Sequence, residues 1–444
     1  MMRSVHNRRA ATLPTDGVPA DSHPKVVKRR LTAWDDLVNA PTRPTSRTAS
    51  SPKLHLKDEE VHGFRDLAHS IVSSTLMQEC DYRRLGSREP DEKQWKLLKR
   101  REDLSVYKYV PLDKASSAFS VKCTGTVEGS MEDMLYGTHS KNRDEMRATA
   151  AYLHSSHMDC AVLNVLESGS DADPYNQLAL KWSVAETFGD ARLVNHRDWF
   201  NIESTGMGVD ECGHRYGYFL ARFANHSGCP PMPDHSDVIR GKMAMCCIYR
   251  QEPGSKVVRV YARGAMELGG GMPAFVTSSA SCAMMFSMAV AMESAAGKRL
   301  TKLALLRMEE RAKERDEGKH TASERSEGDL GRSQTITSSS VMDLLSASMV
   351  SSSQYFASDR KIKSLRVARE PCHVCEKKRP AMPHLVRSAH PKCGICHERT
   401  CSKCNIKRRL VGHSGPVSVL CCKLCIIQSR RLRIDPREPC PILP

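Results

Sequence analysis

The sequence has few aromatic residues and no long apolar segment. Phe, Trp and Tyr together make up 5% of the 444 residues. The most apolar run, residues 282–292, is too short to span a bilayer, which takes about 20 residues. No continuous apolar segment occurs in Met1–Ser51, so nothing there resembles a signal peptide. We therefore expect a soluble protein of the cytoplasm.

Recognisable catalytic motifs are also missing. We find no Ser-His-Asp set, no phosphate-binding loop and no paired carboxylates in a suitable context. The run Gly269-Gly270-Gly271 lacks the Lys and the Ser or Thr that follow the glycines of a phosphate loop. We predict that the protein is not an enzyme.

Positive charge is abundant and gathers at the two ends. Residues 1–55 carry 10 Lys and Arg against 4 Asp and Glu, and residues 361–444 carry 19 against 5. A basic C-terminal region favours an anionic partner, either an acidic membrane or nucleic acid. Nucleic acid is disfavoured because residues 361–444 contain no Phe, Tyr or Trp on which bases could stack.

Cysteine is the informative residue, and ten of the 18 cysteines lie at or beyond Cys372. Eight of these form four Cys-x-x-Cys pairs: Cys372 and Cys375, Cys393 and Cys396, Cys401 and Cys404, and Cys422 and Cys425. Two such pairs complete one tetrahedral zinc site, so we predict two Zn²⁺ ions. Cys421 lies beside Cys422 and could replace it, although Cys422 gives the standard spacing to Cys425. His373 and His397 are expected to face solvent.

The spacing between pairs favours an interleaved arrangement, because four residues separate the middle two pairs. Pairs one and three would bind one ion, and pairs two and four the other. The segment Cys393-Gly-Ile-Cys396-His-Glu-Arg-Thr-Cys401-Ser-Lys-Cys404 resembles a FYVE-type zinc finger. A RING finger, a PHD finger or another treble-clef variant is the alternative.

The FYVE resemblance implies binding to phosphatidylinositol 3-phosphate through residues just before the third cysteine. By this resemblance Arg387, His390 and Lys392 would contact the phosphates. Met382, Leu385 and Val386 would insert into the membrane. Three FYVE signature elements are altered here: the basic cluster is interrupted, no Trp-x-x-Asp precedes Cys372, and Leu420 occupies the position of an expected Arg.

The preceding part of the chain has the periodicity of an α+β domain. Apolar residues recur at helical spacing over 59–79, and two strands (105–110, 119–127) and a broken helix (132–154) follow. Six further strand-like segments are then separated by turns, and a long helix covers 277–311. The strand-like segments are residues 160–166, 177–184, 199–204, 216–223, 238–249 and 257–266. This order resembles a START-like helix-grip fold, in which an antiparallel sheet surrounds a long C-terminal helix. Together with the finger, it resembles the family of START-like plus FYVE-type proteins.

We divide the chain accordingly into five parts. They are a disordered basic tail (1–55), a START-like domain (56–311), a flexible linker (312–365), a FYVE-type finger (366–430) and a C-terminal tail (431–444). The linker would let the finger and the domain move independently. The START-like resemblance implies a lipid ligand, and the methionine-rich half of the last helix would either line its cavity or fill an ordinary core.

The resulting hypothesis is a cytoplasmic adaptor that lies peripherally on endosome-type membranes. Its finger would bind a phosphoinositide or acidic membrane, and its START-like domain would bind lipid. The alternative is a scaffold for protein–protein interaction, with a purely structural zinc finger and no lipid activity.

Overall fold

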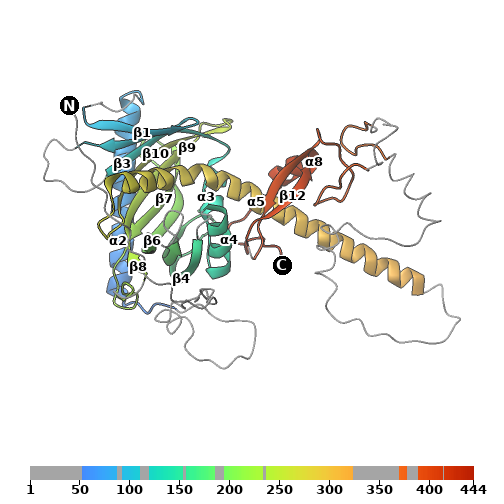
Figure 1. Ribbon diagram of the computed structural model, residues 1–444, viewed down its shortest axis with the longest axis horizontal. Helices are drawn as coiled ribbons and strands as arrows, with labels where there is room; N and C mark the ends of the chain where they lie inside the picture. Colours follow the sequence, from blue (N-terminus) through green and yellow to red (C-terminus); the bar gives the residue numbers. More distant parts are fainter. Residues whose placement is uncertain are drawn as a thin grey trace, which may run out of the picture. The chain divides into compact units, whose positions relative to one another are not determined.

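We describe the protein from a computed structural model. It describes residues 53–87, 93–110, 120–153, 157–185, 195–233, 237–323, 370–377, 389–413 and 415–444. The predicted N-terminal tail, apart from its last residues, and most of the predicted linker lie outside these ranges. The described residues form a body (residues 53–323) and a finger (residues 370–431), followed by the segment 432–444 (Figure 1).

The described part of the body contains four helices and ten strands, and the last helix follows all ten strands, in an order close to the prediction. Its elements are α2 (Asp58–Arg84), β1 (Trp95–Arg101), β2 (Leu104–Tyr109), β3 (Ser120–Glu128), α3 (Met131–Thr138), α4 (Arg143–Leu153), β4 (His157–Glu167), β5 (Gln177–Ala185), β6 (His196–Val209), β7 (Arg215–Phe223), β8 (Val238–Arg240), β9 (Lys242–Arg250), β10 (Val257–Glu267) and α5 (Ala274–Ser323). The finger contributes β11 (Asn405–Leu410), β12 (Val417–Cys422) and α8 (Lys423–Arg431).

The strands of the body form one sheet in the order β1-β2-β3-β10-β9-β7-β6-β5-β4. Neighbouring strands along this path run antiparallel, and β8 pairs in parallel with β6. The segment predicted as one strand over 238–249 is divided at Gly241. A Cβ atom there would lie 2.4 Å from the Trp199 ring, so only glycine fits this close approach.

The two faces of the sheet bind different helices. Met245, Cys247 and Tyr249 of β9 belong to the main core, which also contains the apolar half of α5. Arg250 lies on the other face of β9, where its guanidinium binds the Glu79 carboxylate of α2 at 2.9 Å. The antiparallel sheet is thus packed on α5 along one face, which is the helix-grip arrangement predicted from the sequence.

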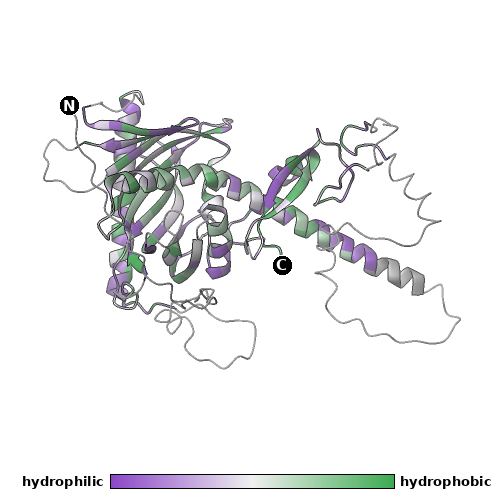
Figure 2. Cartoon of the chain, in the orientation of Figure 1, coloured by the Kyte–Doolittle hydropathy of each residue, from purple (hydrophilic) through white to green (hydrophobic). Residues whose placement is uncertain are grey.

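Helix α5 is long and apolar enough to cross a membrane by length and composition alone. In this structure its apolar first half packs on the sheet (Figures 1 and 2). Met285 and Met288 of this half are buried. Gly137 of α3 allows a close helix crossing, since a Cβ there would lie 1.9 Å from the Ala291 carbonyl oxygen. The helix also continues to Ser323, beyond the end predicted at Arg311.

Candidate metal centres

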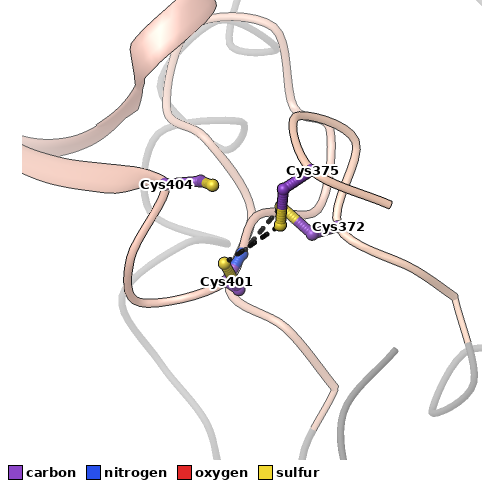
Figure 3. Close-up of side chains that lie close together, drawn as sticks. All are labelled: Cys372, Cys375, Cys401 and Cys404. Atoms are coloured by element: carbon purple, nitrogen blue, oxygen red, sulfur yellow. Dashed lines mark hydrogen bonds between the residues drawn. The ribbon is translucent and has the colours of Figure 1, made fainter. Parts of the chain in front are cut away.

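The eight predicted cysteines form two groups in the finger. One group contains Cys372, Cys375, Cys401 and Cys404, and the other contains Cys393, Cys396, Cys422 and Cys425. Within each group the four Sγ atoms lie within 4.8 Å of one another. Pairs one and three therefore meet, as do pairs two and four, which is the interleaved arrangement expected from the spacing. Figure 3 shows the first group, whose side chains point toward one another.

Short local structures hold each pair in place. Cys422 is the N-cap of α8, and its Sγ accepts a hydrogen bond from the Cys425 backbone N–H at 3.3 Å. The Cys393 Sγ accepts from the backbone N–H of Cys422 at 3.3 Å, and Cys372 Sγ accepts from that of Cys401 at 3.3 Å. Such N–H donors favour the thiolate form of a cysteine, which is the form that ligates a metal.

The donor set fits a tetrahedral metal ion closed on all sides by sulfur. Hydrogen bonds from the Cys396, Cys422 and Cys425 thiols hold the pKa of Cys393 well below its usual range. Neighbouring thiolates repel one another, so four of them in one place need a cation to balance their charge. Because each group already supplies four ligands, neither leaves an open position for a substrate.

The open question about Cys421 is answered by its position. Cys421 is fully buried in an apolar cluster and does not belong to either sulfur group. Burial raises its pKa to about 12, so it stays a neutral thiol. His373 and His397 are exposed, as predicted.

The finger packs against the second half of α5. One cluster combines Leu300, Leu303 and Ala304 of α5 with residues of the finger and the C-terminal segment, namely Cys393, Ile395, Leu410, Cys421, Cys422, Cys425 and Leu443. The Thr301 hydroxyl accepts a hydrogen bond from the Val411 N–H at 2.8 Å. This contact differs from the predicted independent motion of finger and body. The helical spacing of Leu300 and Leu303 is the signal in the sequence that could have indicated this contact.

The segment 432–444 runs back along the body as a strap. Lys141 Nζ donates to the carbonyl oxygens of Pro436 and Arg437, at 2.9 and 3.0 Å, and also to that of Glu438. Farther along, the Leu443 N–H donates to the Val411 carbonyl oxygen at 2.8 Å. These residues, predicted as a tail, therefore join the body and the finger.

The residues predicted to bind phosphoinositide are only partly described. Met382, Leu385, Val386 and Arg387 lie outside the described residues. Lys392 is exposed, but His390 is buried, with 8% of its surface accessible. The His390 carbonyl oxygen accepts from Arg399 at 3.0 Å, which fixes this residue inside the finger. The structure thus does not present His390 at the surface, as the prediction of a headgroup contact requires.

A different exposed surface of the finger was missed by the sequence analysis. Five large apolar side chains on its three regular elements are 37% to 48% exposed: Ile406, Val417, Leu420, Leu424 and Ile427. Basic residues of the same elements are exposed beside them in the sequence, among them Lys407, Arg408, Lys423 and Arg430. We call these two sets together the finger surface. The sequence indicates the positive charge, but the exposure of the apolar residues depends on the fold.

The described part of the body holds one further group of side chains that could ligate a metal, Asp210, Cys212 and His214. The Asp210 carboxylate already binds Arg250 at 2.8 Å and Arg83 at 3.2 Å. Two guanidinium groups on this carboxylate disfavour a cation there, so we assign no metal centre to it.

Comparisons with known proteins yield only distant structural similarity. No protein-family model matches the chain, and no curated protein matches its sequence. Human StAR-related lipid transfer protein 5 matches 52% of this chain and 97% of its own, at 17% identity and a TM-score of 0.36. The lipid transfer and protein localization domain of human StarD13 (DLC2) matches 50% and 95%, at 10% identity and a TM-score of 0.33. A STAR-related lipid transfer protein fragment from Xanthomonas axonopodis matches 45% and 96%, at 13% identity and a TM-score of 0.31.

Proposed function

We propose that this protein is a zinc-containing, non-enzymatic adaptor of the cytoplasm. It would lie peripherally on acidic membranes of endosome type. The observation that carries this proposal is the finger surface. Apolar side chains that stay exposed in a folded domain often mark an interaction site. Exposed basic residues on the same three elements favour an anionic surface, so the combination suits insertion into an acidic lipid interface.

Zinc is the metal that we assign to the two cysteine groups. Four cysteine sulfurs in a closed site are typical of structural Zn²⁺. The metal would hold the four turns of the finger together and neutralise the thiolates. In this proposal the eight cysteine ligands position the finger surface and take no part in chemistry.

A lipid ligand in the body is supported by its methionines. Seven buried methionines belong to the main core: Met131, Met134, Met245, Met266, Met284, Met285 and Met288. Methionine is unbranched and flexible, so a core rich in it can repack around apolar molecules of different shape. The same residues fill an ordinary core in the structure described here, and the lipid would have to displace this packing.

The charged residues of the body interior support the absence of catalysis. Lys181 is buried and its Nζ binds the Glu203 carboxylate at 2.7 Å. The buried Asp198 carboxylate accepts hydrogen bonds from Trp182 and Arg240, both at 2.9 Å. These pairs use the charged groups to satisfy one another, as structural ion pairs do.

A second candidate is a protein-docking scaffold, and the finger surface favours it as well. Exposed Leu424 and Ile427 on one face of a short helix could fill a groove on another protein. The two candidates differ in whether lipid alone suffices for binding.

The test is co-sedimentation of the full-length, zinc-loaded protein with vesicles. We would compare phosphatidylcholine alone with the same lipid containing phosphatidylserine or phosphatidylinositol 3-phosphate. We expect binding to the acidic vesicles, lost in the double variant Leu424→Ser, Ile427→Ser. The matched control is Val209→Ser, which removes a 62% exposed apolar side chain from the body. If a folded, zinc-loaded protein sediments with none of these vesicles, the membrane proposal is wrong and protein docking becomes the better account.

A further inference from the structure

A cleft of about 1030 Å³ lies where the finger meets the body. The body contributes the turn between β3 and α3, the first turn of α3, the end of α4, the turn between β9 and β10, and the middle of α5. The finger contributes β11, β12 and α8. The cleft is therefore not part of the interior of the helix-grip fold, and it exists because the finger packs on α5.

Six cationic residues contribute to the described lining of this cleft, and two of them are already paired. Arg299 binds the Asp133 carboxylate at 2.7 Å, and Arg409 binds that of Glu293 at 2.9 Å. The other four cations are Lys256, Lys407, Arg408 and Arg430. All four are exposed, and none forms an ion pair with any residue in the described part of the chain. Glu128 is the one remaining carboxylate among the described lining residues, so positive charge is in excess there.

The four unpaired cations come from three separate elements. Lys407 and Arg408 lie on β11, Arg430 lies on α8, and Lys256 lies on the turn before β10. Like charges brought together by folding repel one another, so their convergence on one cleft costs stability unless an anion binds between them. A ligand with one carboxylate would balance only one of the four cations. The cleft therefore favours a ligand with several negative charges.

We propose that this cleft binds a small, multiply phosphorylated anion, either the headgroup of a phosphorylated lipid or a soluble polyphosphate of the same kind. Arginine forks and lysine ammonium groups are the usual donors to phosphate. The volume exceeds that of one phosphate and is at the upper end of the range of ordinary ligand pockets, about 300–1000 Å³.

Nucleic acid fits this cleft less well. Among the described residues, Tyr152 is the single aromatic residue of the lining. Its ring is already covered by the Arg409 guanidinium, 4.6 Å from the ring centroid. No free aromatic face of the lining is left for a base to stack on, and stacking is the usual means by which proteins bind single strands.

The inference deepens the proposed function, and it rests on that function only for the source of the headgroup. It assigns phosphate recognition to the junction of finger and body instead of the segment around His390. Because Lys256 belongs to the body and Arg430 to the finger, the anion would bridge the two. Binding would thus stabilise the docked arrangement of the finger.

The experiment titrates the full-length, zinc-loaded protein with fluorescently labelled inositol 1,3,4,5-tetrakisphosphate and follows fluorescence anisotropy. We expect Arg430→Gln, Lys256→Gln and the double variant Lys407→Gln, Arg408→Gln each to weaken binding by about tenfold or more, since each removes a charge-assisted donor. The matched control is Arg431→Gln, which removes the same charge from the next residue of α8, outside the cleft lining. We expect it to change the affinity by less than about twofold. Zinc content and thermal unfolding would verify that each variant is folded.

Three outcomes would overturn the inference. If Arg431→Gln weakens binding as much as Arg430→Gln, the anion binds diffuse charge and not the cleft. If Lys256→Gln has no effect, the site belongs to the finger alone. If the soluble headgroup does not bind at all, the cleft is not a polyphosphate site.

Vesicle binding of the wild-type protein separates this inference from the proposed function. If the wild-type protein does not bind the soluble headgroup but still sediments with acidic vesicles, the cleft proposal is wrong and the membrane function stands. Headgroup binding by the cleft without any sedimentation would contradict the membrane function and support a soluble anion as the ligand.

Discussion

The body buries more than twenty residues in one apolar cluster between its sheet and α5. The finger instead places its cysteine side chains in two groups of four. Four of the ten buried residues of the finger cluster are cysteines, and Ile395 and Leu410 are the large apolar residues that the finger itself contributes. Leu300 and Leu303 of the body complete that cluster. The body should therefore depend on packing and the finger on metal, while the contact with α5 links the stability of the two.

The largest expected effect is the loss of a metal ion from the finger, which should leave the body folded. Cys422→Ser removes one ligand of the second group, so we expect bound zinc to fall from two ions to one per chain. Structural zinc contributes on the order of 10–16 kcal/mol to such modules, which the few apolar residues of the finger cannot replace. Zinc content by mass spectrometry of metals, together with hydrogen exchange of the finger, measures the effect.

The neighbouring cysteine supplies the control for this prediction. Cys421→Ala removes a buried thiol outside both sulfur groups and should leave two zinc ions bound. A protein that keeps both ions in Cys422→Ser, or loses one in Cys421→Ala, would contradict the assignment of ligands.

The second prediction concerns the body, where a buried lysine donates hydrogen bonds to carbonyl groups at the C-terminal end of α3. Lys298 is 1% exposed, and its Nζ donates to the carbonyl oxygens of Tyr136 and His139, both at 2.8 Å. Lys298→Met keeps the apolar stem but leaves these carbonyl groups without a donor. We expect the free energy of unfolding of the body to fall by about 3 kcal/mol. Urea denaturation followed by circular dichroism measures it, and unchanged zinc content would show that the finger is not the cause. An unfolding curve that superposes on that of the wild type would refute this role.

These two regions also differ in how far the sequence predicts them. Alternation and helical periodicity predicted most strands and helices of the body, because one face of each is buried. They missed β1, whose sequence Trp-Lys-Leu-Leu-Lys-Arg-Arg reads as a polar stretch and forms an edge strand with mostly exposed side chains. Cysteine spacing predicted the membership of both sulfur groups in the finger.

The sequence does not indicate how the finger is placed on the body. Docking depends on Leu300 and Leu303 meeting residues about a hundred positions away, and no periodicity encodes such a contact. The strap has no pattern at all, since it is held largely through its backbone by Lys141 and Val411. The cleft lining follows from these contacts, so it could not be predicted either.

The third prediction, with a smaller expected effect, concerns how the stability of the body depends on pH. His139 is buried, its Nδ1 has no hydrogen-bond partner among the described residues, and Lys181, Lys298 and Lys141 lie near it. Burial, followed by these lysines, lowers the pKa of His139 to about 3. The folded state therefore keeps this histidine neutral, whereas the unfolded state protonates it below about pH 6.5. Its contribution to stability is present above pH 6.5 and is lost as the pH falls toward 3, by about 1.4 kcal/mol per pH unit.

The measurement is the unfolding free energy at pH 6.5 and pH 5.5 for wild type and His139→Asn. Between these two pH values the unfolding free energy of the variant should fall by less than that of the wild type, because the contribution of His139 is missing. Zinc release adds its own acid sensitivity, but that part is common to both proteins. Equal slopes in the two proteins would contradict the assignment of this acid sensitivity to His139.

The smallest expected effect comes from a lysine one turn beyond Lys298 on α5. Lys302 Nζ binds the Glu438 carboxylate of the strap at 2.6 Å, and the two side chains are 25% and 57% exposed. Water screens such a pair, so Lys302→Ala should lower the free energy of unfolding by less than about 1 kcal/mol. The same urea series that measures Lys298→Met measures this variant. If Lys302→Ala proved as costly as Lys298→Met, the strap would stabilise the body through its surface charges, and burial would no longer explain the difference between the two lysines.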